Sequence, residues 1–379
     1  MRFFDLHSGS VAELSSKTLA DLHLTERGYL WLSVSRAEFE QQQAELQSTL
    51  QRLCALQLVD LHVSDLLNVQ LPSRYDYTSQ YDLLVFRRLA TANGQSSTTD
   101  AGTAHRGGLP ILRHIDTSPV GFVVFDRVLL SVHPEDCALR DSYAQRLLTA
   151  GSAGSAGGSV AVSTDLRSTG ARGVPTSPAD LMLRIVNHMV DGFLALRREL
   201  SHQLDHWQAE LLNPKTRFAN WSTLLAARQS LHQLDELCED QRSAIQDWIE
   251  ALKSWPDGDA LTSQHERDLL QVRSRDVLEH IERVVHHVRQ LEQSAETAVQ
   301  IHFNAQSHRT NEIMRTLTAL TAVFLPLNLI AGIFGMNFES IPLLHRANGF
   351  WLAMTAMALI ALALVLFFWR KRYLVRSGR

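Results

Sequence analysis

Two uncharged apolar stretches near the C-terminal end constrain this chain more than any other feature. The first runs from Leu317 to Phe334 and the second from Gly349 to Trp369, and neither contains Asp, Glu, Lys or Arg. Each is close to the roughly 20 residues that an α-helix needs to cross a hydrocarbon core about 30 Å thick. Because only residues 335–348 separate them, the sequence predicts a transmembrane two-helix hairpin at 317–369 that carries a large soluble body.

The charge balance and the motifs exclude several classes of protein. The 379 residues include 36 Lys and Arg against 40 Asp and Glu, and this near balance gives no reason to expect nucleic acid as a partner. No Gly-rich phosphate loop followed by Lys and no His-Glu-x-x-His helix is present, which argues against an ATP-driven pump and a metalloprotease. No nucleophile and base stand out together. We therefore expect no enzyme, no catalytic residues and no cofactor.

Loop charges and cysteines predict how the chain is placed in the cell. The tail 370–379 is strongly basic, whereas the loop between the apolar stretches offers only Arg346. The positive-inside rule then puts both termini in the cytoplasm and the loop outside a plasma (inner) membrane. The N-terminus lacks the apolar run of a signal peptide, and Cys54, Cys137 and Cys238 have no metal-ligand spacing, so we expect reduced thiols in a cytoplasmic body.

Residues 1–177 have the pattern of a cytoplasmic α/β domain. Strand and helix signals alternate along it, with strands expected at Tyr29–Val34, Leu83–Phe86, Gly121–Phe125 and Val128–Val132, the last two as a hairpin, and a helix at Ala37–Leu56. Two Gly/Ser/Thr-rich segments interrupt the domain, Thr91–Gly108 and a run that begins at Ala150–Ser159 and leads to Pro178. Such composition is typical of mobile surface loops.

The rest of the soluble body has a helical pattern. Residues 178–258 predict a helical hairpin, with helices at Ala179–Leu212 and Thr223–Lys253. A stalk at 259–316 follows, as part of one helix from Ala260 to Phe334 that would be on the order of 110 Å long. Apolar residues recur along this stalk at alternating spacings of four and three, namely Val277, Ile281, Val284, Val288, Leu291, Ala295 and Ala298. This heptad predicts packing against other helices, and we expect those helices to belong to neighbouring subunits.

The first apolar stretch has one distinct face. Residues at spacings of three and four form a stripe of polar, small and thioether side chains with one leucine, consisting of Asn311, Met314, Thr318, Thr321, Leu325, Asn328, Gly332 and Gly335. Polar groups on a helix in lipid are costly unless they face a bundle interior or a cavity. The stripe therefore fits the lining of a pore shared by several copies of the chain, and its alternative is a helix–helix contact held by small and polar residues.

Sequence around this stripe resembles a known family. The segment Thr310–Arg315, and the segment Phe324–Phe338 with its tripeptide Gly335-Met336-Asn337, resemble the first transmembrane helix and signature loop of the CorA family of divalent-cation transporters. The close resemblance covers roughly residues 305–375, and the rest of the chain agrees in layout. It implies a homopentamer in the lipid bilayer that passes hydrated Mg²⁺, or Co²⁺, into the cytoplasm down its electrochemical gradient, gated by the cytoplasmic domain.

The resemblance also implies roles for individual residues. Gly335, Met336 and Asn337 would form the entrance ring of the pore, with Glu339 beside them in the signature loop 335–348. Mg²⁺ dehydrates reluctantly, so the Asn337 amide would hold the ion by accepting hydrogen bonds from its bound waters. Gly335 would allow a backbone turn that a side chain would block.

Three further residues would act deeper in the pore. Asn328 would form a second polar ring within the membrane. Met314 and Leu317 would form an apolar constriction toward the cytoplasm, able to gate by dewetting.

Several positions keep other interpretations open. The loop has Glu339 as its one acidic residue, Arg346 offsets that charge, and Asn328 stands where many Mg²⁺ transporters of the family have Thr. A Zn²⁺ transporter of the related ZntB branch, coupled to protons, is therefore an alternative. A membrane-anchored scaffold or sensor is a second one. His202 and His206 have a spacing that suits Zn²⁺, although a solvated helix face explains it as well.

Acidic residues of the soluble body could hold a regulatory cation. Candidates are Asp60, Asp65, Asp268, Asp276 and Glu279, and the sequence does not choose between them.

Overall fold

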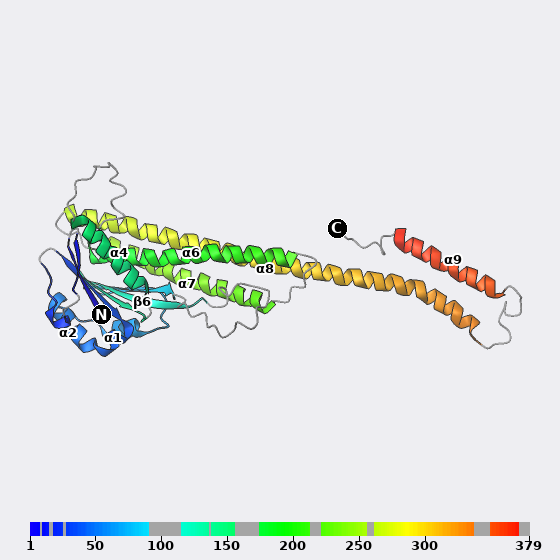
Figure 1. Cartoon of the computed structure of the whole chain (residues 1–379), viewed down its shortest axis with the longest axis horizontal. Helices are drawn as coiled ribbons and strands as arrows, with labels where there is room; N and C mark the ends of the chain where they lie inside the picture. The colour runs from blue at the N-terminus through cyan, green and yellow to red at the C-terminus, as the bar shows by residue number, and fades with distance from the viewer. Residues whose placement is uncertain are drawn as a thin grey trace. The chain divides into compact units, whose positions relative to one another are not determined.

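The computed structural model describes residues 1–7, 10–14, 18–25, 28–90, 115–135, 138–155, 174–212, 221–255, 261–336 and 349–370. The chain forms two compact units, Met1–Ala295 and Glu296–Arg379. Figure 1 shows the elements of both in chain order.

A mixed β-sheet organises the first unit. Its described strands are β1 (Arg2–His7), β2 (Ser10–Glu13), β3 (Tyr29–Ser35), β4 (Arg74–Tyr77), β5 (Asp82–Leu89), β6 (Thr117–Val124) and β7 (Val128–His133). They lie in the order β2-β1-β3-β7-β6-β5-β4. The central pair, β3 and β7, is parallel, from Leu30 opposite Val128 to Ser35 opposite His133, and the other neighbours are antiparallel. The predicted α/β class is therefore confirmed.

The interior strands were predictable because both of their faces are covered. Nearly every residue of β3 and β7 is buried, and such strands read as continuous apolar runs. The predicted hairpin is confirmed as β6 and β7, paired from Gly121 opposite Val132 to Val124 opposite Leu129. The strands β1, β2 and β4 were not predicted, because charged and polar residues dilute their apolar pattern.

One face of the sheet is covered by α1 (Arg36–Gln41), α2 (Gln43–Cys54) and α3 (Asp60–Leu67), with a core that includes Leu32, Phe39 and Leu50. The single helix expected at Ala37–Leu56 is in fact two. At Gln42 the backbone leaves helical geometry, with φ −113° and ψ 26°. Ser35 starts α1 as a capping box, since its hydroxyl accepts from the Glu38 N–H and the Glu38 carboxylate accepts from the Ser35 N–H.

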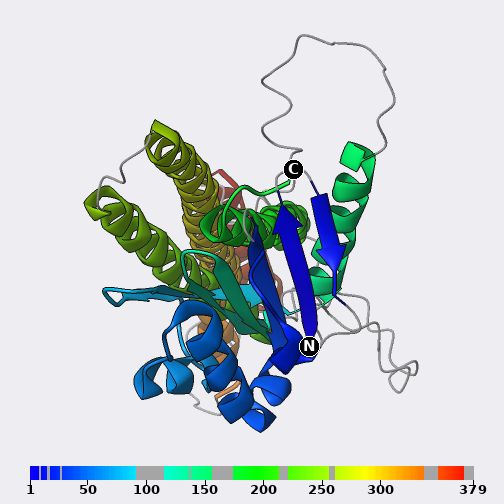
Figure 2. The ribbon, with the colours of Figure 1, turned by 90° about the vertical axis from the view of Figure 1, so that its left-hand side faces the viewer.

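The other face is covered by α4 (Ala138–Ser155), α6 (Pro178–Leu212) and α7 (Trp221–Ser254). Figure 2 shows the sheet between the two groups of helices. The expectation of a loop from Ala150 is wrong for its first residues, because α4 continues to Ser155. Alanine is the best helix former and extends a helix already begun, despite a cost of about 1 kcal/mol for each glycine. The expected loop at Thr91–Gly108 lies outside the described residues.

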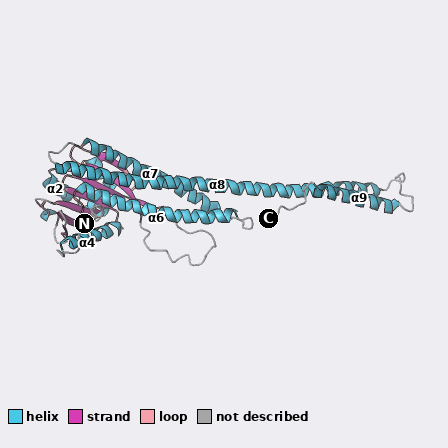
Figure 3. Ribbon diagram, turned by 90° about the horizontal axis from the view of Figure 1, so that it is seen from above, coloured by secondary structure: helices cyan, strands magenta, loops and turns pink. Residues whose placement is uncertain are grey.

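The long helix α8 (Leu261–Phe334) confirms the prediction of one helix through the stalk and the first apolar stretch. Its heptad residues from Val277 to Ala298 are all buried within a single chain, so the expectation that they pack between subunits is wrong. In the first unit α8 lies along α6 and α7 (Figure 3). Trp248 of α7 donates to the Ser274 hydroxyl over 2.9 Å, and Arg289 pairs with Asp235 over 3.0 Å.

Candidate functional site

The second unit contains the end of α8 and the helix α9 (Gly349–Arg370), which runs back beside it (Figure 1). Among the described residues, these are the two helices long and apolar enough to cross a membrane. From Ala319 onward α8 has one less exposed face, which consists of Ala319, Ala322, Val323, Pro326, Leu327, Ile330 and Phe334; Ala319 is buried and the other six are partly covered. The matching face of α9 consists of Ala353, Ala356, Met357, Ile360, Ala361, Leu364 and Phe368.

The predicted stripe lies on the part of α8 that α9 leaves uncovered. All of its members are exposed in the single chain, namely Asn311, Met314, Thr318, Thr321, Leu325, Asn328, Gly332 and Gly335. Leu317 of the predicted constriction is also exposed, at 55% against 57% for Met314. The structure thus places the predicted pore residues on one uncovered surface of α8. Large apolar residues, including Leu320, Phe324 and Leu329, lie beside them and are exposed too.

The threonines of the stripe have a defined hydrogen-bond geometry. The Thr318 hydroxyl donates to the Met314 carbonyl over 2.7 Å, and the Thr321 hydroxyl donates to the Leu317 carbonyl over 2.9 Å. Each hydroxyl hydrogen is therefore used inside the helix, while the oxygen keeps a lone pair as an acceptor. Water bound to a cation presents only donors outward. The stripe offers the acceptors that such a hydrated cation needs, without a charge that would trap it.

The helix ends at the start of the signature loop. The Gly335 N–H donates to the Ala331 carbonyl over 2.9 Å, and a Cβ on Gly335 would lie 3.1 Å from that same oxygen. Glycine is thus favoured here by crowding against the last helical turn, and its backbone is not in the left-handed region. Met336 is exposed at 53%, whereas Asn337 and Glu339 lie outside the described residues.

Proline lies within the membrane-spanning part of α8. Pro326 has no N–H, so the carbonyl four residues earlier, at Ala322, lacks its usual helical donor. Pro326 and Ala322 both lie on the covered side of α8, away from the stripe. The freed carbonyl therefore belongs to the face toward α9.

The first unit, Met1–Ala295, which corresponds to the predicted soluble body and is called the soluble unit below, shows no metal centre among the residues that the structure describes. No group of three or more His, Cys, Asp or Glu side chains there could hold a metal ion. His202 is exposed on α6, and the side chain of His206 is not described. Cys54 and Cys238 are free thiols, and burial raises the pKa of each to about 12.

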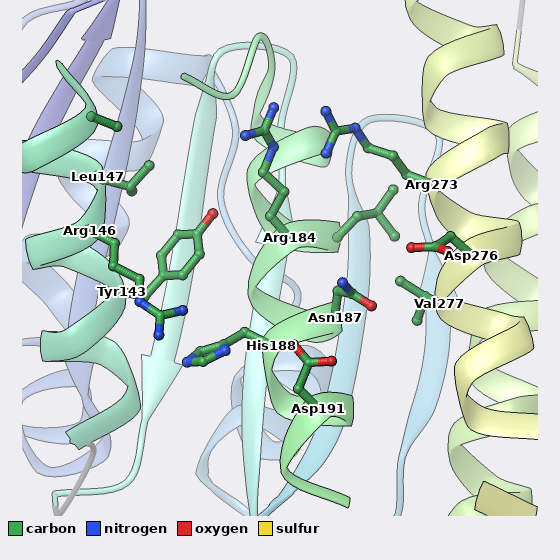
Figure 4. Close-up of a pocket in the computed structure, with 12 residues that line it drawn as sticks. Tyr143, Arg146, Leu147, Arg184, Asn187, His188, Asp191, Arg273, Asp276 and Val277 are labelled. Carbon is green, nitrogen blue, oxygen red and sulfur yellow. The ribbon is translucent and has the colours of Figure 1, made fainter. Parts of the chain in front are cut away.

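A cavity of about 360 Å³ lies between α4, α6 and α8 (Figure 4). On its border Arg184 and Arg273 both reach Asp180, over 3.2 and 2.8 Å, and Asp180 is fully buried. Asp180 also accepts from the Thr176 N–H over 3.1 Å at the start of α6. This ion triad joins α6 to α8. Sequence reasoning missed it, although the i,i+4 spacing of Asp180 and Arg184 was a signal for its first half.

The remaining polar groups of this cavity come from α4 and α6, except for Asp276 of α8. Burial, with the nearby Arg146 guanidinium, lowers the pKa of His188, and burial raises the pKa of Tyr143. Their rings lie 6.4 Å apart. The basic side chains are balanced by Asp191 and Asp276 in the lining and by Asp180 behind it, so the cavity has no strong preference for either sign of ligand charge.

Comparison with known proteins places these features in a family. The sequence profile described as "CorA-like Mg2+ transporter protein" matches residues 27–372. The Cobalt/magnesium transport protein CorA of Thermotoga maritima is 26% identical over 201 residues, which are 51% of this chain and 52% of that protein. The Putative metal ion transporter YfjQ of Bacillus subtilis is 40% identical over 65 residues, 17% of this chain and 20% of that one. The chain therefore aligns with about half the length of the first relative and less of the second.

Solved structures agree over much greater lengths. The complete structure of the CorA magnesium transporter from Methanocaldococcus jannaschii matches with a TM-score of 0.67 at 16% identity, covering 100% of this chain and 98% of that one. The structure of the full-length CmaX protein matches with a TM-score of 0.65 at 17% identity, covering 98% and 97%. These likenesses confirm the predicted CorA-like fold. Since the family profile covers most of the sequence as well, this chain belongs to the CorA-like Mg²⁺ transporter family.

Proposed function

We propose that the chain is one subunit of a channel that passes hydrated divalent cations, with Mg²⁺ as the principal ion, into the cytoplasm. The subunits would form a homopentamer in the plasma (inner) membrane, with both termini cytoplasmic. Family membership and the likeness to a cobalt/magnesium transport protein support this proposal. The two apolar helices α8 and α9 supply the membrane-spanning part.

The observation that carries the proposal is the uncovered stripe on α8. Asn328, Thr318 and Thr321 lie on a surface that α9 does not cover, in a segment whose other residues are apolar. In lipid such polar groups are costly unless they face a bundle interior or a water-filled path. Copies of the chain around an axis would bring their stripes together there, and the apolar residues beside each stripe would meet neighbouring subunits or lipid.

The proposed pathway needs no covalent step. A ring of Asn337 amides would accept hydrogen bonds from the waters of the ion, and Asn328 with the threonine oxygens would continue this acceptor surface. Met314 and Leu317 would close the path by dewetting. A doubly charged ion gains roughly 4.6 kcal/mol on crossing 100 mV, which is sufficient to drive influx without ATP.

The test is ion flux into proteoliposomes that contain an Mg²⁺ or a Zn²⁺ indicator. We expect voltage-driven Mg²⁺ influx for the wild type. Influx should be reduced by about tenfold or more for Asn337→Ala and for the double variant Thr318→Val with Thr321→Val, which corresponds to an activation free energy higher by at least about 1.4 kcal/mol. Thr355→Val on α9 is a matched control, because its hydroxyl also donates to a helical carbonyl, that of Trp351, over 2.9 Å.

Each other outcome has a defined meaning. If Thr355→Val reduced Mg²⁺ influx as much as the double variant Thr318→Val with Thr321→Val does, the stability of the helices, and not the stripe, would limit the flux. Zn²⁺ influx without Mg²⁺ influx, raised by an inward proton gradient, would replace the proposal with the ZntB-type alternative. No flux of Mg²⁺, Co²⁺ or Zn²⁺ from intact oligomers would favour the scaffold or sensor.

A further inference from the structure

We propose that the soluble unit binds a linear aliphatic polyamine in a cleft between the sheet edge and the ends of three helices. The cleft has a volume of about 520 Å³, within the usual range for small-molecule sites. It is bordered by the β4–β5 hairpin, the turn between β6 and β7, the start of α6, the end of α7 and the start of α8. The proposal concerns this cleft alone and does not depend on the ion pathway.

Aromatic rings form one wall of the cleft and are held in place by their neighbours. The rings of Tyr75 and Tyr77 stack with centroids 6.1 Å apart and planes at 17°. Tyr75 also meets Trp248 edge-on at 5.8 Å, and Trp248 meets Trp255 edge-on at 5.7 Å. Tyr77 is nevertheless 66% exposed. Such faces attract a cation within about 6 Å and also provide apolar contact for the methylene groups between two amines.

The charged groups of the lining favour a cation. Its described residues include three carboxylates, those of Asp82, Asp126 and Glu266, against the single guanidinium of Arg267. The Tyr75 hydroxyl donates to Asp82 and fixes that carboxylate beside the aromatic wall. Asp126 is exposed on the turn between β6 and β7, and Glu266 is half-buried on α8. An anionic ligand would therefore be repelled from most of this surface.

The distribution of these carboxylates selects an extended cation over a metal ion. Asp82, Asp126 and Glu266 come from three separate elements, and no group of three His, Cys, Asp or Glu side chains among the described residues could hold a metal ion. A polyamine carries ammonium groups several methylenes apart, so it can pair with separated carboxylates at once. Each ammonium offers three donors, and charge-assisted hydrogen bonds of this kind are the strong ones.

A polyamine bound in the cleft would link α8 to the sheet. Glu266 lies near the beginning of α8, whereas Tyr75, Asp82 and Asp126 belong to the sheet and its turns. A ligand that pairs with both sides would stabilise the folded soluble unit by RT ln(1 + [L]/Kd), a free energy that grows with the logarithm of the ligand concentration above Kd. Polyamine binding should therefore raise the thermal midpoint of the full-length protein.

The experiment is isothermal titration of spermidine, and separately of 1,4-diaminobutane, into the full chain in detergent. We expect saturable binding of spermidine that is weakened by about tenfold or more in the double variant Asp126→Asn with Glu266→Gln, corresponding to at least about 1.4 kcal/mol. Tyr77→Leu should weaken it as well, through loss of the cation–π contact. Glu250→Gln is the matched control, because Glu250 is an exposed carboxylate of α7 outside the cleft.

Several results would overturn the proposal. The first is the absence of saturable spermidine binding. The second is a loss of spermidine affinity in Glu250→Gln as large as that in the double variant, and the third is an unchanged spermidine affinity in the double variant. Displacement of spermidine by Mg²⁺ with the same dependence on Asp126 and Glu266 would identify a metal site instead. Tighter binding of tetramethylammonium than of either amine would identify a quaternary-ammonium cage. Oligomeric state and thermal midpoint without ligand are measured for every variant, so that misfolding is not read as lost binding.

Discussion

Buried polar side chains of the central strands form hydrogen bonds with one another in the core. Trp31 of β3 donates to the Ser131 hydroxyl over 2.8 Å, and that hydroxyl shares a hydrogen bond of 2.8 Å with the His133 ring. All three side chains are fully buried. Burial, reinforced by Arg140 and Arg88, lowers the pKa of His133 to about 3.

The lowered pKa of His133 predicts an acid-sensitive fold. In the unfolded chain histidine titrates near pH 6.5, so between about pH 6.5 and 3 the unfolded state binds a proton that the folded state does not. Stability should therefore fall as the pH is lowered through this range, by up to about 1.4 kcal/mol per pH unit.

Thermal midpoints of the full chain measured at pH 7, 6 and 5 test this pH dependence of stability. His133→Gln should flatten the slope, and Ser131→Ala, which keeps the imidazole, should lower stability but retain the slope. An unchanged slope in His133→Gln would contradict the assignment.

Asp180 is the second residue whose environment leads to a prediction. Its carboxylate is 0% exposed and pairs with Arg184 and Arg273, so Asp180→Asn would leave two guanidinium groups without their shared counter-charge. Breaking a buried ion pair by removing one partner costs about 3–5 kcal/mol. We expect a loss of this order in chemical denaturation of the full chain. Asp268→Asn, at an exposed position of α8, should change stability by less than about 0.5 kcal/mol.

Among the elements, α8 combines three surfaces along one helix. Its heptad residues from Val277 to Ala295 pack inside the first unit, its later apolar residues face α9, and the polar stripe is left uncovered. The helix itself was predictable from the heptad spacing of its apolar residues and from the absence of Pro and Gly between Leu261 and Leu325, and Pro326 does not end it. The surface against which the heptad residues pack was not predictable from the sequence. Helices α6 and α7 present apolar faces of the same kind as those that a neighbouring subunit would present.

Intrachain packing of the heptad can be tested by truncation. Ile281 is 1% exposed, so Ile281→Ala should destabilise the chain by about 2–5 kcal/mol. Val272 on the same helix is 64% exposed, and Val272→Ala should change stability by less than about 0.5 kcal/mol. Since Ile281 is buried within one chain, the loss should not depend on protein concentration. A midpoint that shifts with concentration only in Ile281→Ala would place this residue between subunits.

At the scale of the whole molecule, the uncovered stripe predicts that the proposed ion conduction needs several chains. One hairpin cannot enclose a water-filled path, because its two helices have no other wall. In oligomers assembled from mixed wild-type and Asn337→Ala chains, flux should fall more steeply than the wild-type fraction. Mixtures with Thr355→Val should retain full flux. A strictly linear fall with the Asn337→Ala fraction would indicate that each chain conducts alone.

The sequence by itself determined the two apolar helices, the long helix α8, the interior strands β3, β6 and β7, and the stripe, because each depends on a local pattern of side chains. The break at Gln42 and the length of α4 were missed, since small differences in local preference decide them. Only the tertiary structure decided which chain covers the heptad, that Arg273 meets Asp180, and that Asp126 and Glu266 border one cleft. Those residues are far apart in the sequence, and no local pattern records which distant side chain will lie opposite.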